Sequence, residues 1–95
     1  FSRQVEAFAR SGDVAIAIST SGSSRNVLAA MKKASLQGAK VIGLTGSPGG
    51  KMKAFCTVLI ATASSHTPRI QEGHITIGHI ICELVEERMC SHVQR

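Results

Sequence analysis

Apolar residues follow two patterns along the chain: short continuous runs, and longer segments with an apolar residue every three or four positions. The continuous runs predict three buried strands, at residues 13–18, 40–45 and 57–61. The wider spacing predicts helices at residues 1–10, 26–37 and 69–90, and a short helical turn at 51–55. Because parallel strands need a long crossover between them, this alternation predicts an α/β fold with a parallel sheet.

The first predicted strand and the last predicted helix are both more apolar than a small surface element requires. The run Val14–Ile18 contains no polar residue, which predicts that both faces of its strand are covered. The last helix carries a stripe at helical spacing, formed by Ile70, His74, Ile77, Ile81, Leu84 and Val85. We expect part of this stripe to pack against another subunit or against further protein, and the tail at residues 91–95 to fray.

The chain holds 95 residues, enough for at most one small domain. It opens with Phe1 in a segment that already reads as helix, so we expect it to start within a larger fold. Neither an apolar run of about 18 residues nor a charged-then-apolar leader is present, which predicts a cytoplasmic protein without a membrane span. Three cysteines, Cys56, Cys82 and Cys90, lack Cys-x-x-Cys spacing, so free thiols are expected.

Charge is unevenly distributed in a chain whose formal net charge is +5. No acidic residue lies between Asp13 and Glu72, whereas seven Lys and Arg residues do. The three aromatic residues and the absence of a Lys/Arg run argue against a nucleic-acid surface, and a small anionic substrate fits better. Solvated lysines on helix faces explain part of this charge in any fold.

Residues 19–24, the serine loop, read Ser-Thr-Ser-Gly-Ser-Ser between the first predicted strand and the following helix. Five hydroxyls, loop amides and a helix N-terminus can together donate hydrogen bonds to an anion. Ligands of parallel sheets bind outside the carboxyl ends of strands, which is where this loop lies. The loop therefore predicts a phosphate site, although Ser, Thr and Gly are also ordinary residues of turns and helix caps.

Two other phosphate or nucleophile motifs are excluded by their spacing. The Gly-Lys pair at Lys51 is not a Walker loop, because Thr45 stands at its first glycine and Met52 at its Ser/Thr. The Gly-x-Ser-x-Gly elbow of hydrolases is absent, because Ser19 occupies its first glycine.

Gln71 and His79 form a second candidate site on the last predicted helix. At standard helix geometry they lie roughly 12 Å apart along the axis and about 80° around it. Two long side chains at this separation can converge on a substrate or a metal ion placed between them. Alternatively, His79 is a core histidine satisfied by a carbonyl or by Glu83, and Gln71 is a polar residue of the first turn.

The serine loop and the second site occur together with other segments that resemble the sugar isomerase (SIS) family. The matching segments are Ile18 with the serine loop, Thr45-Gly46, Gly49-Gly50-Lys51-Met52 and Arg69-Ile-Gln-Glu72 with His74 and His79. The resemblance implies a three-layer αβα sandwich with a parallel sheet, flavodoxin-like or Rossmann-like. Residues 1–95 would form the C-terminal portion of a single SIS domain, in a protein that is usually a homotetramer.

Within that family the chain is similar to enzymes that convert sedoheptulose 7-phosphate to D-glycero-D-manno-heptose 7-phosphate for lipopolysaccharide. The resemblance assigns the sugar phosphate to Ser19, Thr20, Ser21 and Ser24. It places Gln71 against the substrate, makes His79 catalytic, and makes both residues ligands of the zinc ion that some members bind. Two departures, Pro68 before the Arg-Ile-Gln-Glu segment and Ser23 in place of asparagine, remove none of these residues.

Two non-enzymatic readings from the same family remain as alternatives. One SIS protein binds a DNA replication initiator and lacks the histidine that matches His79, so the presence of His79 favours the enzyme. A sugar-phosphate sensor of a regulator would need a DNA-binding region outside these residues.

Overall fold

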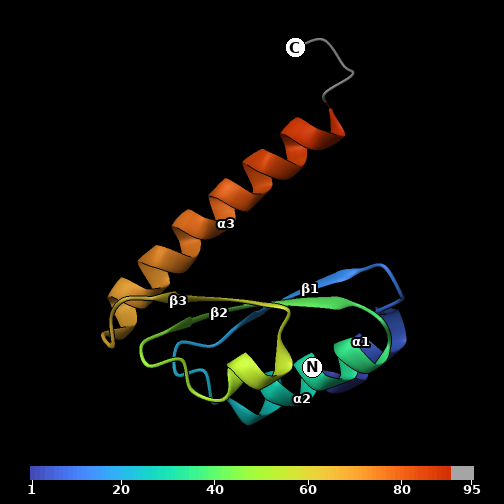
Figure 1. Ribbon diagram of the computed structural model, residues 1–95, viewed down its shortest axis with the longest axis horizontal. Coiled ribbons are helices and arrows are strands. Elements are labelled where there is room, and N and C mark those ends of the chain that lie inside the picture. The colour runs from blue at the N-terminus through green and yellow to red at the C-terminus, as the bar shows by residue number, and fades with distance from the viewer. Residues whose placement is uncertain (91–95) are drawn as a thin grey trace.

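Three parallel strands form one sheet in the order β1-β2-β3, as the alternation of apolar patterns predicts. The computed structural model describes residues 1–90 (Figure 1), and the tail expected to fray lies outside the described residues. The strands are β1 (Val14–Ile18), β2 (Lys40–Gly46) and β3 (Val58–Thr62). In their register Ile16 pairs with Ile42, and Ile42 pairs with Val58.

The helices agree with the predicted segments to within a few residues. They are α1 (Ser2–Phe8), α2 (Arg25–Leu36), the 3₁₀ helix η1 (Met52–Phe55) and α3 (Thr67–Met89). The helix α3 begins two residues before the predicted start, because Pro68 lies in its first turn, where a missing N–H costs nothing. None of the helices in residues 1–90 is long and apolar enough to cross a membrane.

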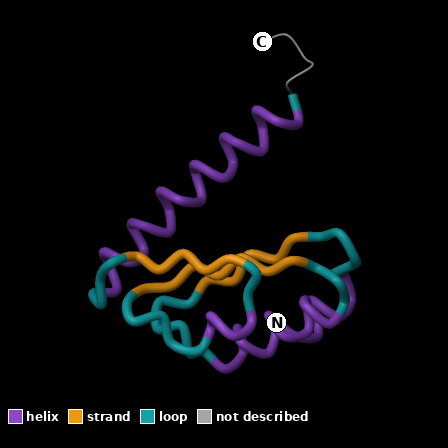
Figure 2. The backbone as a smooth tube through the Cα atoms, in the orientation of Figure 1, coloured by secondary structure: helices purple, strands orange, loops and turns teal. Residues whose placement is uncertain are grey.

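The helices lie on both sides of the sheet, which gives the α/β layering implied by the family resemblance (Figure 2). On one side α2 covers β1 and β2, and both α1 and η1 pack against α2. The core lies on this side and consists of Met31, Ala34, Ala39, Val41 and Met52. On the other side α3 contacts β2 and β3 and then runs away from the sheet (Figure 1).

The prediction that both faces of β1 are covered is wrong for this structure. Val14, Ile16 and Ile18 are 58%, 47% and 54% exposed, and they share one face because side chains alternate along a strand. Val58 of β3 is half-exposed as well. The reason is that α3 leaves the sheet without covering β1. We call this exposed part of the α3 side the open face.

The apolar stripe of α3 is likewise buried in one part and exposed in another. Its first members, Ile70 and His74, are buried, whereas Leu84 and Val85 in its C-terminal half are exposed. The expectation that part of the stripe packs against another subunit or further protein stays a prediction.

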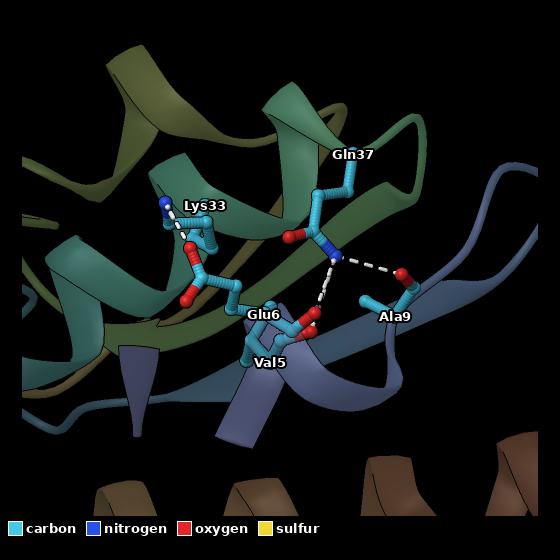
Figure 3. A network of polar contacts seen from close by, with 5 residues as sticks. All are labelled: Val5, Glu6, Ala9, Lys33 and Gln37. Atoms are coloured by element: carbon cyan, nitrogen blue, oxygen red, sulfur yellow. Dashed lines mark hydrogen bonds and ion pairs between the residues drawn. The ribbon is translucent and has the colours of Figure 1, made fainter. Parts of the chain in front are cut away.

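One glutamine fastens α1 to α2 (Figure 3). The amide nitrogen of Gln37 donates to the carbonyl oxygens of Val5, Glu6 and Ala9, at 3.2, 3.3 and 2.7 Å. These carbonyls lie at the C-terminal end of α1, where the helix leaves carbonyl groups without an intrahelical partner; that of Val5 also accepts the amide of Ala9 at 2.8 Å. Lys33 also pairs with Glu6 at 3.1 Å, but this ion pair is exposed and adds little stability. The contacts fix α1 beside the helix that follows the serine loop.

Candidate functional site

The serine loop begins directly where β1 leaves the sheet. The amide of Ser19 donates to the carbonyl of Leu44 at 3.0 Å, which continues the β1–β2 ladder by one bond. The side chain of Ser19 is buried, with the residue 5% exposed, and its hydroxyl lies 2.8 Å from that of Ser24 and 3.4 Å from that of Ser21. The structure therefore brings together three of the four residues assigned to a phosphate.

Hydrogen bonds within the loop set the direction of its backbone. The amide of Gly22 donates to both the carbonyl oxygen and the hydroxyl of Ser19, at 3.1 Å each, and the amide of Ser23 donates to the Ser21 hydroxyl at 3.2 Å. Thr20 is fixed through its backbone, because its carbonyl accepts the hydroxyl of Thr45 at 3.4 Å. These hydrogen bonds fold the loop into a tight turn and keep its hydroxyl groups close together.

Ser24 is the N-cap residue of α2, but its side chain makes no cap hydrogen bond to the helix. Its hydroxyl instead contacts Ser19, so the ordinary capping role does not account for this serine. The first turn of α2 contains no acidic side chain either. The positive end of the helix dipole therefore faces the loop without a carboxylate from that turn to neutralise it.

Two glycine turns interlock beneath the site. A Cβ atom at Gly22 would overlap the carbonyl oxygen of Gly49, and one at Gly50 would meet the carbonyl of Gly22. The amide of Lys51 donates to the carbonyl of Gly22 at 2.8 Å. The sequence identified residues 46–50 only as a turn, and it missed that this turn supports the serine loop, since contact between distant glycines leaves no pattern.

The start of α3 packs across the ends of β2 and β3 through close contacts. Gly46 has no Cβ, which leaves room for the side chain of Ile70, and Gly73 likewise fits against Thr62. His74, only 6% exposed, places its Nε2 atom 2.9 Å from the carbonyl oxygen of Thr45. The sequence placed His74 in an apolar stripe, and the structure confirms its burial but adds a polar contact.

Gln71 and His79 are both exposed on α3. Within residues 1–90 neither side chain has a hydrogen bond or ion pair, so the structure does not bring them to each other or to the serine loop. The alternative of a core histidine at position 79 is not supported, because that residue is neither buried nor bonded to Glu83. Their predicted roles in substrate and metal binding stay predictions.

The described residues provide only part of the ligand set that a metal ion bound to Gln71 and His79 would need. The described residues contain no group of three or more His, Cys, Asp or Glu side chains that could hold one. Gln71 and His79 offer one oxygen and one nitrogen, whereas zinc takes four ligands. The His79 imidazole is an ordinary zinc ligand and the Gln71 amide oxygen an unusual one, so a zinc ion held by both would need further ligands from outside residues 1–90.

The cysteines and the nearest charges add nothing to the ligand set. All three cysteines are free, as predicted. Arg69, next to the second candidate site, is paired with Glu72 at 2.9 Å in an exposed contact. An apolar hollow of about 370 Å³ lies beside β1, bordered by residues of α1 and α2, but no serine-loop residue lines it.

Comparison with known proteins agrees with these features. Residues 1–78 match the family model described as the SIS domain. The phosphoheptose isomerase of a Nitratiruptor species is 58% identical over 87 residues, which are 92% of this chain and 46% of the relative. The phosphoheptose isomerase of Rhodospirillum rubrum is 54% identical over 91 residues, 96% of this chain and 48% of the relative.

Solved structures show the same likeness in three dimensions. The structure of phosphoheptose isomerase from Neisseria gonorrhoeae has a TM-score of 0.86 at 45% identity, covering 90% of this chain and 49% of that one. A phosphoheptose isomerase from Francisella tularensis has a TM-score of 0.87 at 33% identity, covering 92% and 49%. The chain thus spans about half the length of these proteins, and over that length its sequence and fold place it in the SIS domain family.

Proposed function

We propose that this chain belongs to a phosphoheptose isomerase, which converts sedoheptulose 7-phosphate to D-glycero-D-manno-heptose 7-phosphate. The observation that carries the proposal is the serine loop, in which Ser19, Ser21 and Ser24 gather their hydroxyls at the carboxyl end of β1. Relatives that are 50–58% identical and named phosphoheptose isomerase support the choice of substrate.

The serine loop would bind the phosphate of the sugar. Ser21 and the other loop hydroxyls donate hydrogen bonds, and the N-terminus of α2 adds partial positive charge. The interlocked turns hold this geometry before the substrate arrives, so little ordering is left for the binding step. Anchoring the phosphate at one end of the sugar fixes where the carbonyl end lies, which is the requirement for chemistry at adjacent carbons.

Isomerisation moves a proton between two adjacent carbons through an enediol. His79 suits the proton transfer, because an imidazole nitrogen can accept a proton and give it back. Gln71 can hold a substrate oxygen but cannot act as a base, because its amide has no titratable proton. A second acid or base is needed, and it would come from outside this chain.

Zinc is a further part of the proposal. Gln71 and His79 would hold the ion together with ligands from outside residues 1–90. When bound, zinc supplies a Lewis acid that polarises the substrate carbonyl. We also propose that the protein is a cytoplasmic homotetramer and that its product is used in lipopolysaccharide synthesis. The exposed apolar residues of α3 and of the open face support an oligomer, because such patches are typical of protein–protein contacts.

The test is turnover by the full-length protein that contains this chain. The purified protein is incubated with sedoheptulose 7-phosphate, with and without added zinc, and the aldose product is followed by NMR. Formation of the heptose 7-phosphate is the expected result. Sugar-phosphate binding without turnover would contradict the proposed isomerase activity and favour a non-catalytic SIS module.

A further inference from the structure

His74 is a buried polar side chain that the proposed chemistry does not use. It lies on α3 between Gln71 and His79, is 6% exposed, and has its Nε2 atom 2.9 Å from the carbonyl oxygen of Thr45. A carbonyl can only accept, so Nε2 carries the hydrogen and donates it. The other ring nitrogen, Nδ1, is also buried and has no partner within residues 1–90. A histidine that keeps one such atom unpaired costs stability that a leucine would not.

The other close contacts between α3 and the sheet are apolar or glycine contacts. Ile70 packs over Gly46, and Gly73 packs over Thr62, so both contacts are close but non-directional. Such contacts hold one side of the helix against the sheet without a preferred hydrogen-bond direction. A hydrogen bond to a strand carbonyl is directional and supplies what these contacts lack.

The rotation of α3 decides where the second candidate site points. At about 100° per residue, Gln71 lies about 60° from His74 around the helix, and His79 lies about 140° from it on the same side as Gln71. Fixing His74 on the sheet therefore turns Gln71 and His79 outward together. Both are exposed, as this geometry requires.

The residue that His74 contacts, Thr45, is also hydrogen-bonded to the serine loop. Thr45, whose carbonyl accepts the histidine, is fully buried, and its own hydroxyl donates to the carbonyl of Thr20 at 3.4 Å. His74 and Thr20 are thus joined through a single residue of β2. The C-terminal end of β2 therefore contacts both parts of the candidate site, which lie far apart along the chain.

We infer that His74 is a positioning residue: its Nε2–H bond to Thr45 sets the rotation of α3, and so the placement of Gln71 and His79 relative to the serine loop. This inference rests on the proposed function for its catalytic consequence, but the placement itself can be measured without turnover.

The experiment uses the full-length protein with two substitutions at one position. His74→Leu removes the donor and keeps the volume, whereas His74→Gln keeps an Nε2–H donor at similar reach. The matched control is His66→Gln, because His66 is exposed and its side chain makes no cap hydrogen bond to α3. Should His74→Leu fail to fold, His74→Met takes its place.

Steady-state kinetics gives the first readout. A misplacement of 1 Å costs roughly 100-fold in rate, so His74→Leu should lower kcat at least about tenfold. Its KM should stay within about threefold, because the phosphate anchor is on β1 and α2. His74→Gln should recover most of kcat, and His66→Gln should match the wild type. A lower melting temperature with normal kcat in His74→Leu would overturn the inference.

A distance measurement gives the second readout. Spin labels are placed at Ser23→Cys and at the native Cys82 of α3, with Cys56 and Cys90 replaced by serine and labelled subunits diluted in unlabelled protein. His74→Leu should shift or broaden the distance between the labels, and His74→Gln should preserve it. An unchanged distance in His74→Leu overturns the inference even if kcat falls. Absence of wild-type turnover overturns the proposed function instead, and the distance still decides the role of His74.

Discussion

The two faces of the sheet differ in the size of the side chains they carry and in how much covers them. On the side of α2, β1 presents the small residues Ala15 and Ala17, and β2 presents Val41 together with Gly43, which lies against Met52. On the side of α3 the same strands carry Val14, Ile16, Ile18 and Ile42, and the first three are about half exposed. In β1 the larger apolar side chains therefore lie on the less covered side.

Each face also carries one part of the candidate site. The serine loop leads into α2, on the covered side, and its hydroxyls already contact one another. Gln71 and His79 are on α3, on the open side, and have no polar partner within the described chain. The difference teaches that a loop can order its own hydroxyls within a half-length chain, whereas the polar side chains of the open side find no partner in the same residues.

The largest expected effect is complete loss of turnover in residues 1–95 expressed alone. The open face and the exposed stripe of α3 offer apolar surface that the chain does not cover, so the product should self-associate or aggregate. Light scattering coupled to size exclusion should give masses above the 10.0 kDa of one chain. A monodisperse monomer with isomerase activity would contradict the division between the two faces.

The next effect is on stability and compares one residue from each face in the full-length protein. Met31→Ala empties a site that is 1% exposed, and it should lower the free energy of unfolding by about 2–5 kcal/mol. If more protein covers the open face, Ile16→Ala should cost about as much. Denaturant unfolding measures both. A cost under about 1 kcal/mol for Ile16→Ala would mean that the open face stays open.

His79→Asn tests the open side of the site. If His79 transfers the proton, turnover should fall by on the order of 100-fold while sugar-phosphate binding is kept, because the anchor is on the other side. If it is a metal ligand, the zinc content should fall too, and Gln71→Ala should lower it in parallel. Normal turnover with a lower melting temperature would remove His79 from the site.

The smallest expected effect belongs to the covered side. Replacing Ser19 and Ser21 together by alanine removes two donors to a charged group, so sugar-phosphate affinity should fall by at least about tenfold. Titration calorimetry measures this in the full-length protein. Ser35→Ala, on the exposed part of α2, is the control and should bind normally. Unchanged affinity in the double variant would refute the phosphate assignment.

The secondary structure could be predicted from the sequence because its signals are local. Val14–Ile18 reads as a strand from its own composition, and Gly38 marks the end of α2 where its backbone has a φ of +88°. The position of the serine loop followed from the order of the elements alone. The start of α3 was predicted only to within two residues, because Pro68 reads as part of the preceding connection but lies in the first turn of the helix.

The contacts between distant residues could not be predicted in this way. Gly22 meets Gly49 and Gly50 across 27 or 28 positions of sequence, and glycines are read as turns wherever they occur. His74 falls at an apolar spacing, so nothing local separates a hydrogen-bonded histidine from a core one. The exposure of Ile16 depends on where α3 leaves the sheet, which no periodicity within β1 records.

The fastening of α1 has a consequence for motion. This helix has no buried residue, and it is held by the amide of Gln37, one exposed ion pair and the partly buried side chain of Val5. Local opening of a segment needs little free energy when few buried contacts are lost. We therefore expect α1 to undock as a unit, ahead of global unfolding, and its amides to exchange with solvent faster than those of β2. Undocking of α1 would then expose the apolar hollow beside β1 for short periods. We expect this transient exposure to add to the self-association predicted for residues 1–95 expressed alone.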